Sequence, residues 1–373
     1  METVLTKVTL PLSVLQEMVS KAVKGSTMVD VIPLSCLMQI KVQDNTLTVR
    51  ATDNSTHVIA TASVQCDNFE FCVNSRKFAA IISKLSCAEI TLTVEEKKLG
   101  IHGNGVYNIP VEKDSGNPVV FPDVMFNPTS STKHVISSEF HTIISLNKSC
   151  KSNNKEIPCL YNYYFDNEKT LTTDQYKFCY NPVVVSDTPI MVTPNVIDLA
   201  NDCLDDDYGV DICHDATSIM FYSENTKANI KYYVIGRKSS QADLDAFPVA
   251  PLMEVLTKQT TQSREINRSD LRAAADRMTL FTDVLDKTKV SLSFQAEGIV
   301  LSEEGSQSTE LVKYADKSEV EIPETSMNIS CADLINTLNA FSEKMFISYL
   351  QDTGVCLTSG NIKLMICQVG EGE

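Results

Sequence analysis

The stretch VNSRKFAAIISKL at residues 73–85 decides the fold, because two later stretches repeat its pattern. Its apolar residues have the i, i+3, i+4, i+7 spacing of one helix face, at Phe78, Ile81, Ile82 and Leu85. Asn74 or Ser75 can cap this helix. Similar apolar stripes follow in MVTPNVIDLANDCL at 191–204 and in ISCADLINTLNAF at 329–341. The sequence therefore predicts three related amphipathic helices.

The spacing of these helices indicates an internal repeat. They begin 118 and 138 residues apart. Thr193, followed by Pro194, and Ser330 are the expected caps of the second and third helices. Another helix-like segment opens each third of the chain, near residues 10, 136 and 266. Period-two strand patterns and turn residues fill the rest, so each third reads strand, helix, strands, helix, strands.

Two proline-bearing stretches, 117–130 and 246–263, separate the thirds, and each contains a Phe-Pro pair. We therefore predict an α+β fold of three tandem similar domains, at 1–125, 126–253 and 254–373. Each domain is expected to pack two helices on antiparallel sheets.

Composition limits the function. The chain has 32 basic and 48 acidic residues, a net charge of −16, which argues against tight DNA binding but permits loose contact through a local patch. No apolar run reaches 18 residues, and the N-terminus lacks the pattern of a signal peptide. We expect a cytoplasmic protein without a membrane partner. Twelve cysteines without a CxxC pair are expected to be buried free thiols.

Several strings resemble one known family. They are Ala-Thr-Asp at 51–53, Thr-Thr-Asp at 172–174, Val-Asn-Ser-Arg-Lys-Phe at 73–78, Ile-Pro-Leu at 32–34, and Phe-Pro at 121–122 and 247–248. In order and spacing the whole chain resembles the bacterial DNA polymerase III beta subunit, the DNA sliding clamp. The resemblance implies a head-to-tail homodimer ring, with helices lining the hole and sheets forming the rim.

A ring of this kind would act by tethering. The resemblance implies that the protein encircles duplex DNA without sequence preference and holds the replicative DNA polymerase and other partners there. A clamp loader would open the ring. A tethered polymerase rebinds at a high effective concentration, so no catalytic residue, cofactor or metal is expected.

Sparse basic residues on the lining helices would supply weak phosphate contacts. The candidates are Lys21, Lys24, Arg76, Lys77, Lys84, Lys148, Lys151, Lys155, Arg268 and Arg272. Helical spacing places Lys148, Lys151 and Lys155 on one face, and likewise Lys77 and Lys84. The alternative is solvated helix faces with internal pairs such as Arg268 with Asp270 or Arg272 with Asp276.

The resemblance also implies a pocket between the second and third domains for a short apolar peptide. The matching positions are Leu160, Thr173, Gln175, Tyr176, Lys177, Phe178, Pro248, Met253, Val355, Leu364, Met365, Ile366 and Cys367. The family usually has Gly-His-Arg-Leu where this chain has residues 175–178. It usually ends in Met-Pro-Met/Leu-Arg-Leu, whereas residues 365–369 lack the proline and arginine, and a tail at 370–373 is added.

Other interpretations stay open. The helix beginning at 194 is acidic, with Asp198, Asp202 and aspartates at 205–207, so its carboxylates point away from DNA or it contributes little. The five histidines are scattered, and Cys213, His214 and Asp215 lie in a strand-like run whose neighbours face opposite ways, which argues against an enzyme. A protein–protein scaffold of repeated α+β domains that does not bind DNA is the alternative. Basic residues gathered on one concave surface would favour the clamp.

Overall fold

The computed structural model describes residues 6–27, 33–95, 97–258, 263–281, 289–303, 305–316, 325–350 and 352–370. The chain divides into two compact units, Met1–Phe140 with Val192–Lys238 and His141–Met191 with Ser239–Glu373. Ile32 and the tail residues 371–373, named in the sequence comparison above, lie outside the described residues.

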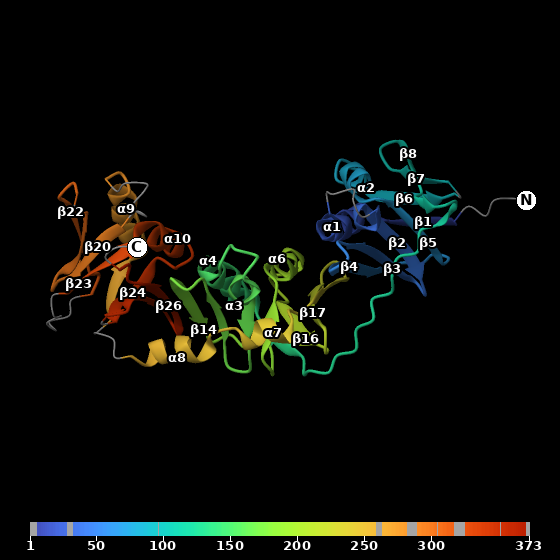
Figure 1. Ribbon diagram of the computed structural model, residues 1–373. Helices are drawn as coiled ribbons and strands as arrows, with labels where there is room; N and C mark the ends of the chain where they lie inside the picture. Colours follow the sequence, from blue (N-terminus) through green and yellow to red (C-terminus); the bar gives the residue numbers. More distant parts are fainter. Residues whose placement is uncertain are drawn as a thin grey trace, which may run out of the picture. The chain divides into compact units, whose positions relative to one another are not determined.

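Short helices accompany the sheets (Figure 1). In chain order they are α1 (Leu12–Ala22), η1 (Val23–Gly25), η2 (Pro33–Cys36), α2 (Ser75–Ile82), α3 (Ser137–Thr142), η3 (Ile143–Asn147), α4 (Lys148–Cys150), α5 (Pro158–Tyr161), α6 (Pro194–Cys203), α7 (Gln241–Asp245), α8 (Val249–Thr257), α9 (Arg268–Met278) and α10 (Cys331–Leu338). No helix in the described ranges is long and apolar enough to cross a membrane.

The first unit holds two larger antiparallel sheets. One has the order β1 (Thr6–Pro11), β6 (Glu89–Val94), β7 (Lys98–His102) and β8 (Val106–Pro110). The other has eight strands in the order β11 (Lys133–Val135), β16 (Val210–His214), β17 (Ser218–Asn225), β18 (Ile230–Arg237), β4 (Thr56–Ser63), β3 (Thr46–Thr52), β2 (Leu37–Gln43) and β5 (Phe69–Asn74). A short ribbon joins β9 (Lys113–Asp114) to β10 (Asn117–Pro118).

The second unit repeats this plan. Its eight-stranded sheet runs β15 (Ile190–Val192), β12 (Tyr163–Phe165), β13 (Thr170–Thr173), β14 (Lys177–Asn181), β26 (Ile362–Cys367), β25 (Gly354–Ser359), β24 (Lys344–Leu350) and β19 (Arg264–Asn267). Its four-stranded sheet runs β22 (Ser308–Lys313), β21 (Gly298–Glu303), β20 (Lys289–Phe294) and β23 (Thr325–Ser330).

Both eight-stranded sheets are made from two thirds of the chain. Strand β18 pairs with β4 from Ile230↔Ala62 to Gly236↔Thr56, and β14 pairs with β26 from Lys177↔Ile366 to Tyr180↔Lys363. Each third therefore contributes two groups of four antiparallel strands, and the middle third is shared between the units. This arrangement confirms the predicted α+β fold of three similar domains; the exact boundaries stay a prediction.

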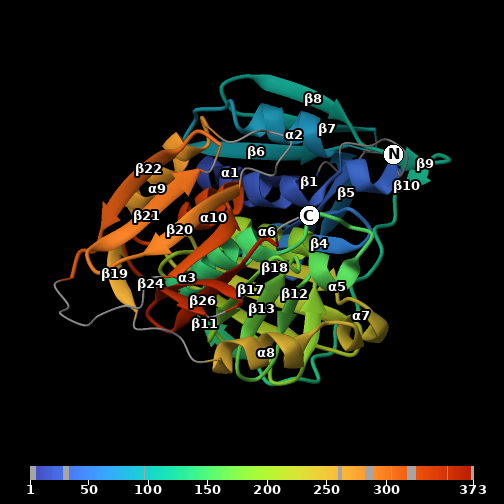
Figure 2. The ribbon, with the colours of Figure 1, turned by 60° about the vertical axis from the view of Figure 1, so that its left-hand side comes forward.

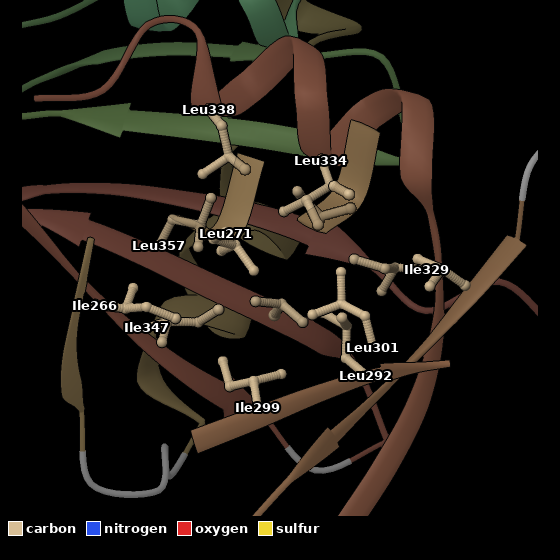
Figure 3. Close-up of a cluster of buried hydrophobic side chains, with 14 of the residues drawn as sticks. Ile266, Leu271, Leu292, Ile299, Leu301, Ile329, Leu334, Leu338, Ile347 and Leu357 are labelled. Carbon is tan, nitrogen blue, oxygen red and sulfur yellow. The ribbon is translucent and has the colours of Figure 1, made fainter. Parts of the chain in front are cut away.

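The core of the last third shows how helices and sheets are held together. Side chains of α9, α10 and both sheets meet in one apolar cluster (Figure 3). Leu271, Leu334 and Leu338 come from the helices and are fully buried. Burying one such side chain contributes about 1.5–3 kcal/mol. The apolar stripe predicted at 329–341 thus forms the buried face of α10.

Helix capping follows the prediction at two of the three repeats. The side chain of Asn74 accepts a hydrogen bond from the Lys77 amide at 3.0 Å, and Ser330 accepts from the Asp333 amide at 3.2 Å. Thr193 precedes Pro194 but makes no side-chain cap. The expectation for Thr193 was wrong, because Pro194 at the first helical position already removes one of the unpaired amides that a cap would serve.

A turn of one design closes two strand pairs. Thr52 donates to the Thr56 carbonyl at 2.8 Å, and Thr173 donates to the Lys177 carbonyl at 2.9 Å. The following aspartate accepts backbone amides in both turns, for example from Thr56 to Asp53 at 2.7 Å. The repeated Thr-Asp strings at 51–53 and 172–174 therefore build equivalent turns, which explains their resemblance to each other.

Candidate functional site

The basic residues of α2 are exposed. Arg76 and Lys77 lie in its first turn, and no ion pair of either is found within the described ranges. The predicted helix at 73–85 is shorter than expected, since α2 ends at Ile82. Lys84 is also exposed but lies in the turn after the helix, so it does not extend the helical face of Lys77.

Lys21 and Lys24 are engaged with the acidic helix. The Lys21 ammonium donates to the Leu204 carbonyl at 3.1 Å and lies 4.7 Å from the centre of the Tyr232 ring. Lys24 pairs with Asp202 at 3.0 Å, and both side chains are about half exposed. These two lysines are partly neutralised, which weakens their expected contribution to DNA contact.

The same contacts explain the acidic segment after α6. Asp202 pairs with Lys24, and Asp207 pairs with Lys227 at 2.6 Å. Asp205 accepts the backbone amide of Asp207 at 3.0 Å and so closes a turn. Within the described residues, no three His, Cys, Asp or Glu side chains gather as ligands for a metal ion.

The expected helical face of Lys148, Lys151 and Lys155 does not exist. Helix α4 ends at Cys150, and Lys151 has an extended backbone with φ −75° and ψ 153°. Lys148 is exposed on the helix, whereas the Lys151 side chain is 9% exposed. The ammonium groups of Lys151 and Lys155 lie 4.6 and 6.0 Å from the centre of the Tyr161 ring.

A buried polar network explains this early helix end. Turn η3 is π-helical, and Asn147 at its end is completely buried. The Asn147 side chain donates to Thr172 at 3.3 Å and accepts from Asn181 at 3.2 Å. Satisfying these groups fixes the helix against β13 and β14. Apolar periodicity carries no signal for such a network, so the sequence pattern extended the helix too far.

Arg268 and Arg272 lie on α9 and are both paired. Arg268 pairs with Glu343 at 3.1 Å rather than with Asp270. Arg272 lies 3.7 Å from Asp276, as the alternative interpretation expected. The first pair joins the start of the helix to the chain just before β24. Of the ten candidates, Arg76, Lys77, Lys84, Lys148 and Lys155 are the exposed ones.

The predicted partner pocket is divided between the two faces of one sheet. Phe178 and Met365 are buried beside Leu350 and Cys356 on one face, where the half-buried Leu252 of α8 packs on them. Pro248 begins α8, which lies along this sheet (Figure 1 and Figure 2). Met253 packs in the neighbouring cluster of Tyr164, Leu171, Met191 and Phe247.

Three of the predicted pocket residues face the other way. Val355, Leu364 and Ile366 belong to the core under α9 and α10 and are almost fully buried. Strand alternation puts them opposite Met365, so a peptide lying on the α8 side does not reach them. Cys367 is half-buried, and its amide donates to the Tyr176 carbonyl at 2.7 Å.

The α8 surface was only partly foreseen. Every apolar side chain of α8 is half-buried or exposed, and none is buried. Leu252, Val255 and Leu256 contact the sheet but were not among the predicted pocket residues. Their signal was present in the sequence, because residues 249–256 read VAPLMEVL and are nearly all apolar. This surface suits an apolar segment of a partner.

The turn between β13 and β14 carries the polar residues of the predicted pocket. Lys177 lies 2.7 Å from Asp174 and also donates to Asp333 of α10. Burial lowers the pKa of Lys177, but its hydrogen bonds to Asp174 and Asp333 outweigh burial and raise the pKa overall. Tyr176 is 58% exposed. Leu160 and Thr173 are buried and support the turn from below.

Residues 213–215 do not form a compact catalytic set. Strand β16 ends at His214, whose backbone amide accepts no proton but donates to Ser130 at 2.8 Å. All twelve cysteines are free; seven are buried and the others half-buried. Burial raises the pKa of the Cys72 thiol to about 12 and that of Cys331 to about 11, so these thiols behave as small apolar groups.

Known proteins were compared with this geometry. Residues 6–118 match the family described as DNA polymerase III beta subunit, N-terminal domain. No curated protein sequence matches the chain. Among solved structures, the DNA polymerase III subunit beta from Borrelia burgdorferi has a TM-score of 0.80 at 14% identity, covering 98% of this chain and 100% of that one.

Two further structures agree. The beta sliding clamp from C. crescentus has a TM-score of 0.80 at 15% identity, covering 98% of this chain and 99% of that one. The DNA polymerase sliding clamp from Bacillus subtilis has a TM-score of 0.79 at 17% identity, with the same two coverages. The chain therefore has the fold of the bacterial DNA polymerase III beta subunit, and residues 6–118 carry the sequence signature of that family's N-terminal domain.

Proposed function

We propose that the protein is a divergent DNA sliding clamp, a processivity factor without catalytic activity of its own. The observation that carries the proposal is the threefold repeat of two four-stranded groups and their helices, which continues over the whole length of solved clamps. It would encircle duplex DNA in the cytoplasm and tether a replicative DNA polymerase, after a clamp loader has opened it.

The charges suit a ring that slides. A net charge of −16 opposes tight gripping of phosphates, while the exposed Arg76, Lys77, Lys84 and Lys148 provide a few weak contacts. Each contact releases counterions and is independent of base sequence. A handful of such contacts attracts duplex DNA without fixing it in one place.

Two strand edges are suited to closing the ring. Strand β8 is the edge of a first-unit sheet, where Val106 and Tyr107 are 64% and 41% exposed. Strand β22 is the edge of a second-unit sheet and exposes Leu311, while Leu280 and Phe281 after α9 are 80% and 50% exposed. Open edges with exposed apolar side chains pair readily with another chain. We propose that β8 of one protomer meets β22 of its partner.

Light scattering tests this closure. A mass near twice 41.2 kDa is expected at micromolar concentration. Tyr107→Glu and Phe281→Glu each bury a charge at the proposed contact and should shift the protein to a monomer. The matched control is Phe346→Glu, at an exposed aromatic residue of β24 away from both edges, and should remain a dimer. A wild-type monomer at every concentration, or dimers of both edge variants, would contradict the proposal.

A further inference from the structure

A polar pocket of about 430 Å³ opens in the second unit beside the end of α4. Lys148, Lys151 and Lys177 line it together with a single acid, Asp174, and the polar side chains of Tyr176 and Asn336. A pocket of this size accommodates a few side chains of a ligand. A B-form duplex, whose major groove alone is about 12 Å wide, cannot enter it.

The charges in this pocket differ in their availability. Lys177 is bound to Asp174 and Asp333, so its charge is compensated within the protein. Lys151 is held nearly buried by the Tyr161 ring at 4.6 Å and by the Ser152 carbonyl at 3.3 Å, both of which leave it cationic. Lys148 is exposed at the rim. The pocket is therefore a local positive site on an acidic protein.

The helix end places these lysines. Because α4 stops at Cys150, the chain turns, and Lys151 enters the pocket wall instead of continuing the helical face of Lys148. The pocket also meets the predicted partner surface at one turn. Tyr176 and Lys177 line the pocket, and the next residue, Phe178, points to the opposite face of the sheet, into the cluster under α8.

We propose that this pocket accepts a carboxylate side chain from a partner protein's binding segment, so that this chain selects segments carrying an acid beside apolar residues. The inference rests on the proposed function, since it concerns the partners of a clamp. A carboxylate would form charge-assisted hydrogen bonds with Lys148 and Lys151. The acidic surface elsewhere would repel the same segment, which makes the position of the acid a determinant of specificity.

Selection from a displayed library of random octapeptides tests the proposal with the intact protein. Wild type should enrich Asp or Glu next to apolar residues. The double variant Lys148→Gln with Lys151→Gln should lose this acidic enrichment while still enriching apolar residues. Lys155→Gln, an exposed lysine of the same loop outside the pocket lining, serves as the control and should behave as wild type.

A selected acidic peptide should then bind wild type at least about tenfold more tightly than its Asn or Gln counterpart, and less than about threefold more tightly to the double variant. Enrichment without acids, an acidic preference that survives in the double variant, or failure to select any peptide would overturn the proposal. Lysine-dependent binding of an oligothymidylate without lysine-dependent peptide binding would assign the pocket to single-stranded DNA instead. Retention on circular DNA involves no peptide, so failure of the clamp function would be seen separately.

Discussion

At Gln175 the backbone has a φ of 83°, a left-handed conformation that costs a residue with a side chain about 1 kcal/mol. The equivalent residue of the first repeated turn, Asn54, has a φ of 76°. The turn thus demands this geometry at both places, and the clamp family's usual residue at the second is glycine. The sequence difference at 175 is therefore a local cost within an unchanged turn.

Gln175→Gly should raise the free energy of unfolding by about 0.5–1 kcal/mol, because relief of the left-handed strain exceeds the entropy that glycine adds to the unfolded chain. Urea unfolding followed by circular dichroism measures the change. Gln295→Gly, at a residue without positive φ, is the control and should lower stability. Equal losses for the two variants would show that the turn at 175 is not strained.

At the scale of elements, the three repeated helices are alike in pattern but not in capping. Asn74→Ala and Ser330→Ala should each lower the free energy of unfolding by about 1 kcal/mol, since each removes a hydrogen bond to a helix amide. Thr193→Ala removes no cap and should leave stability unchanged within error. The urea midpoints of the three variants decide this; a loss at Thr193 as large as at Asn74 would contradict the capping geometry.

The seam between β4 and β18 contains a histidine that should make stability depend on pH. Burial lowers the pKa of His57, and the nearby Arg50 and Arg237 lower it further. His57 pairs with Ile235 across the seam. The folded state favours neutral His57, so its contribution is present above the unfolded pKa and is lost as pH falls through the folded pKa.

Between pH 7.5 and 5, wild type should therefore lose about 1–2 °C more in unfolding temperature than His57→Gln does. Thermal unfolding at a series of pH values provides the comparison. His141→Gln, at an exposed histidine, keeps His57 and should lose stability with pH as wild type does. Identical pH dependence in wild type and His57→Gln would rule out the seam histidine as the cause.

Sequence patterns were sufficient where one periodicity dominates. The stripes at 73–85 and 329–341, the paired strands and the Thr-Asp turns predicted the repeat, because burial of one face decides those elements. They failed where polar contacts between distant residues decide the structure. The Asn147 network ends a helix early, and Lys24 with Asp202 neutralises an expected DNA contact. No local pattern encodes either contact.

At the scale of the whole molecule, the central claim is topological: DNA passes through a closed ring of two protomers. Acidic charge and few exposed bases mean that affinity alone would not hold the protein on DNA. A closed ring is held by linkage, so it should stay on circular DNA and leave linear DNA by sliding off an end. Simple DNA affinity makes no such distinction.

The most direct measurement traps the ring around DNA. Protomers carrying the photo-crosslinking residue p-benzoylphenylalanine at position 107 are separated by dilution, concentrated with a nicked circular plasmid, and irradiated to join the proposed β8 and β22 edges. We predict protein that remains with the plasmid in denaturing detergent and is released when one restriction cut linearises the DNA. Absence of plasmid-bound protein, or binding that survives linearisation, would contradict the account.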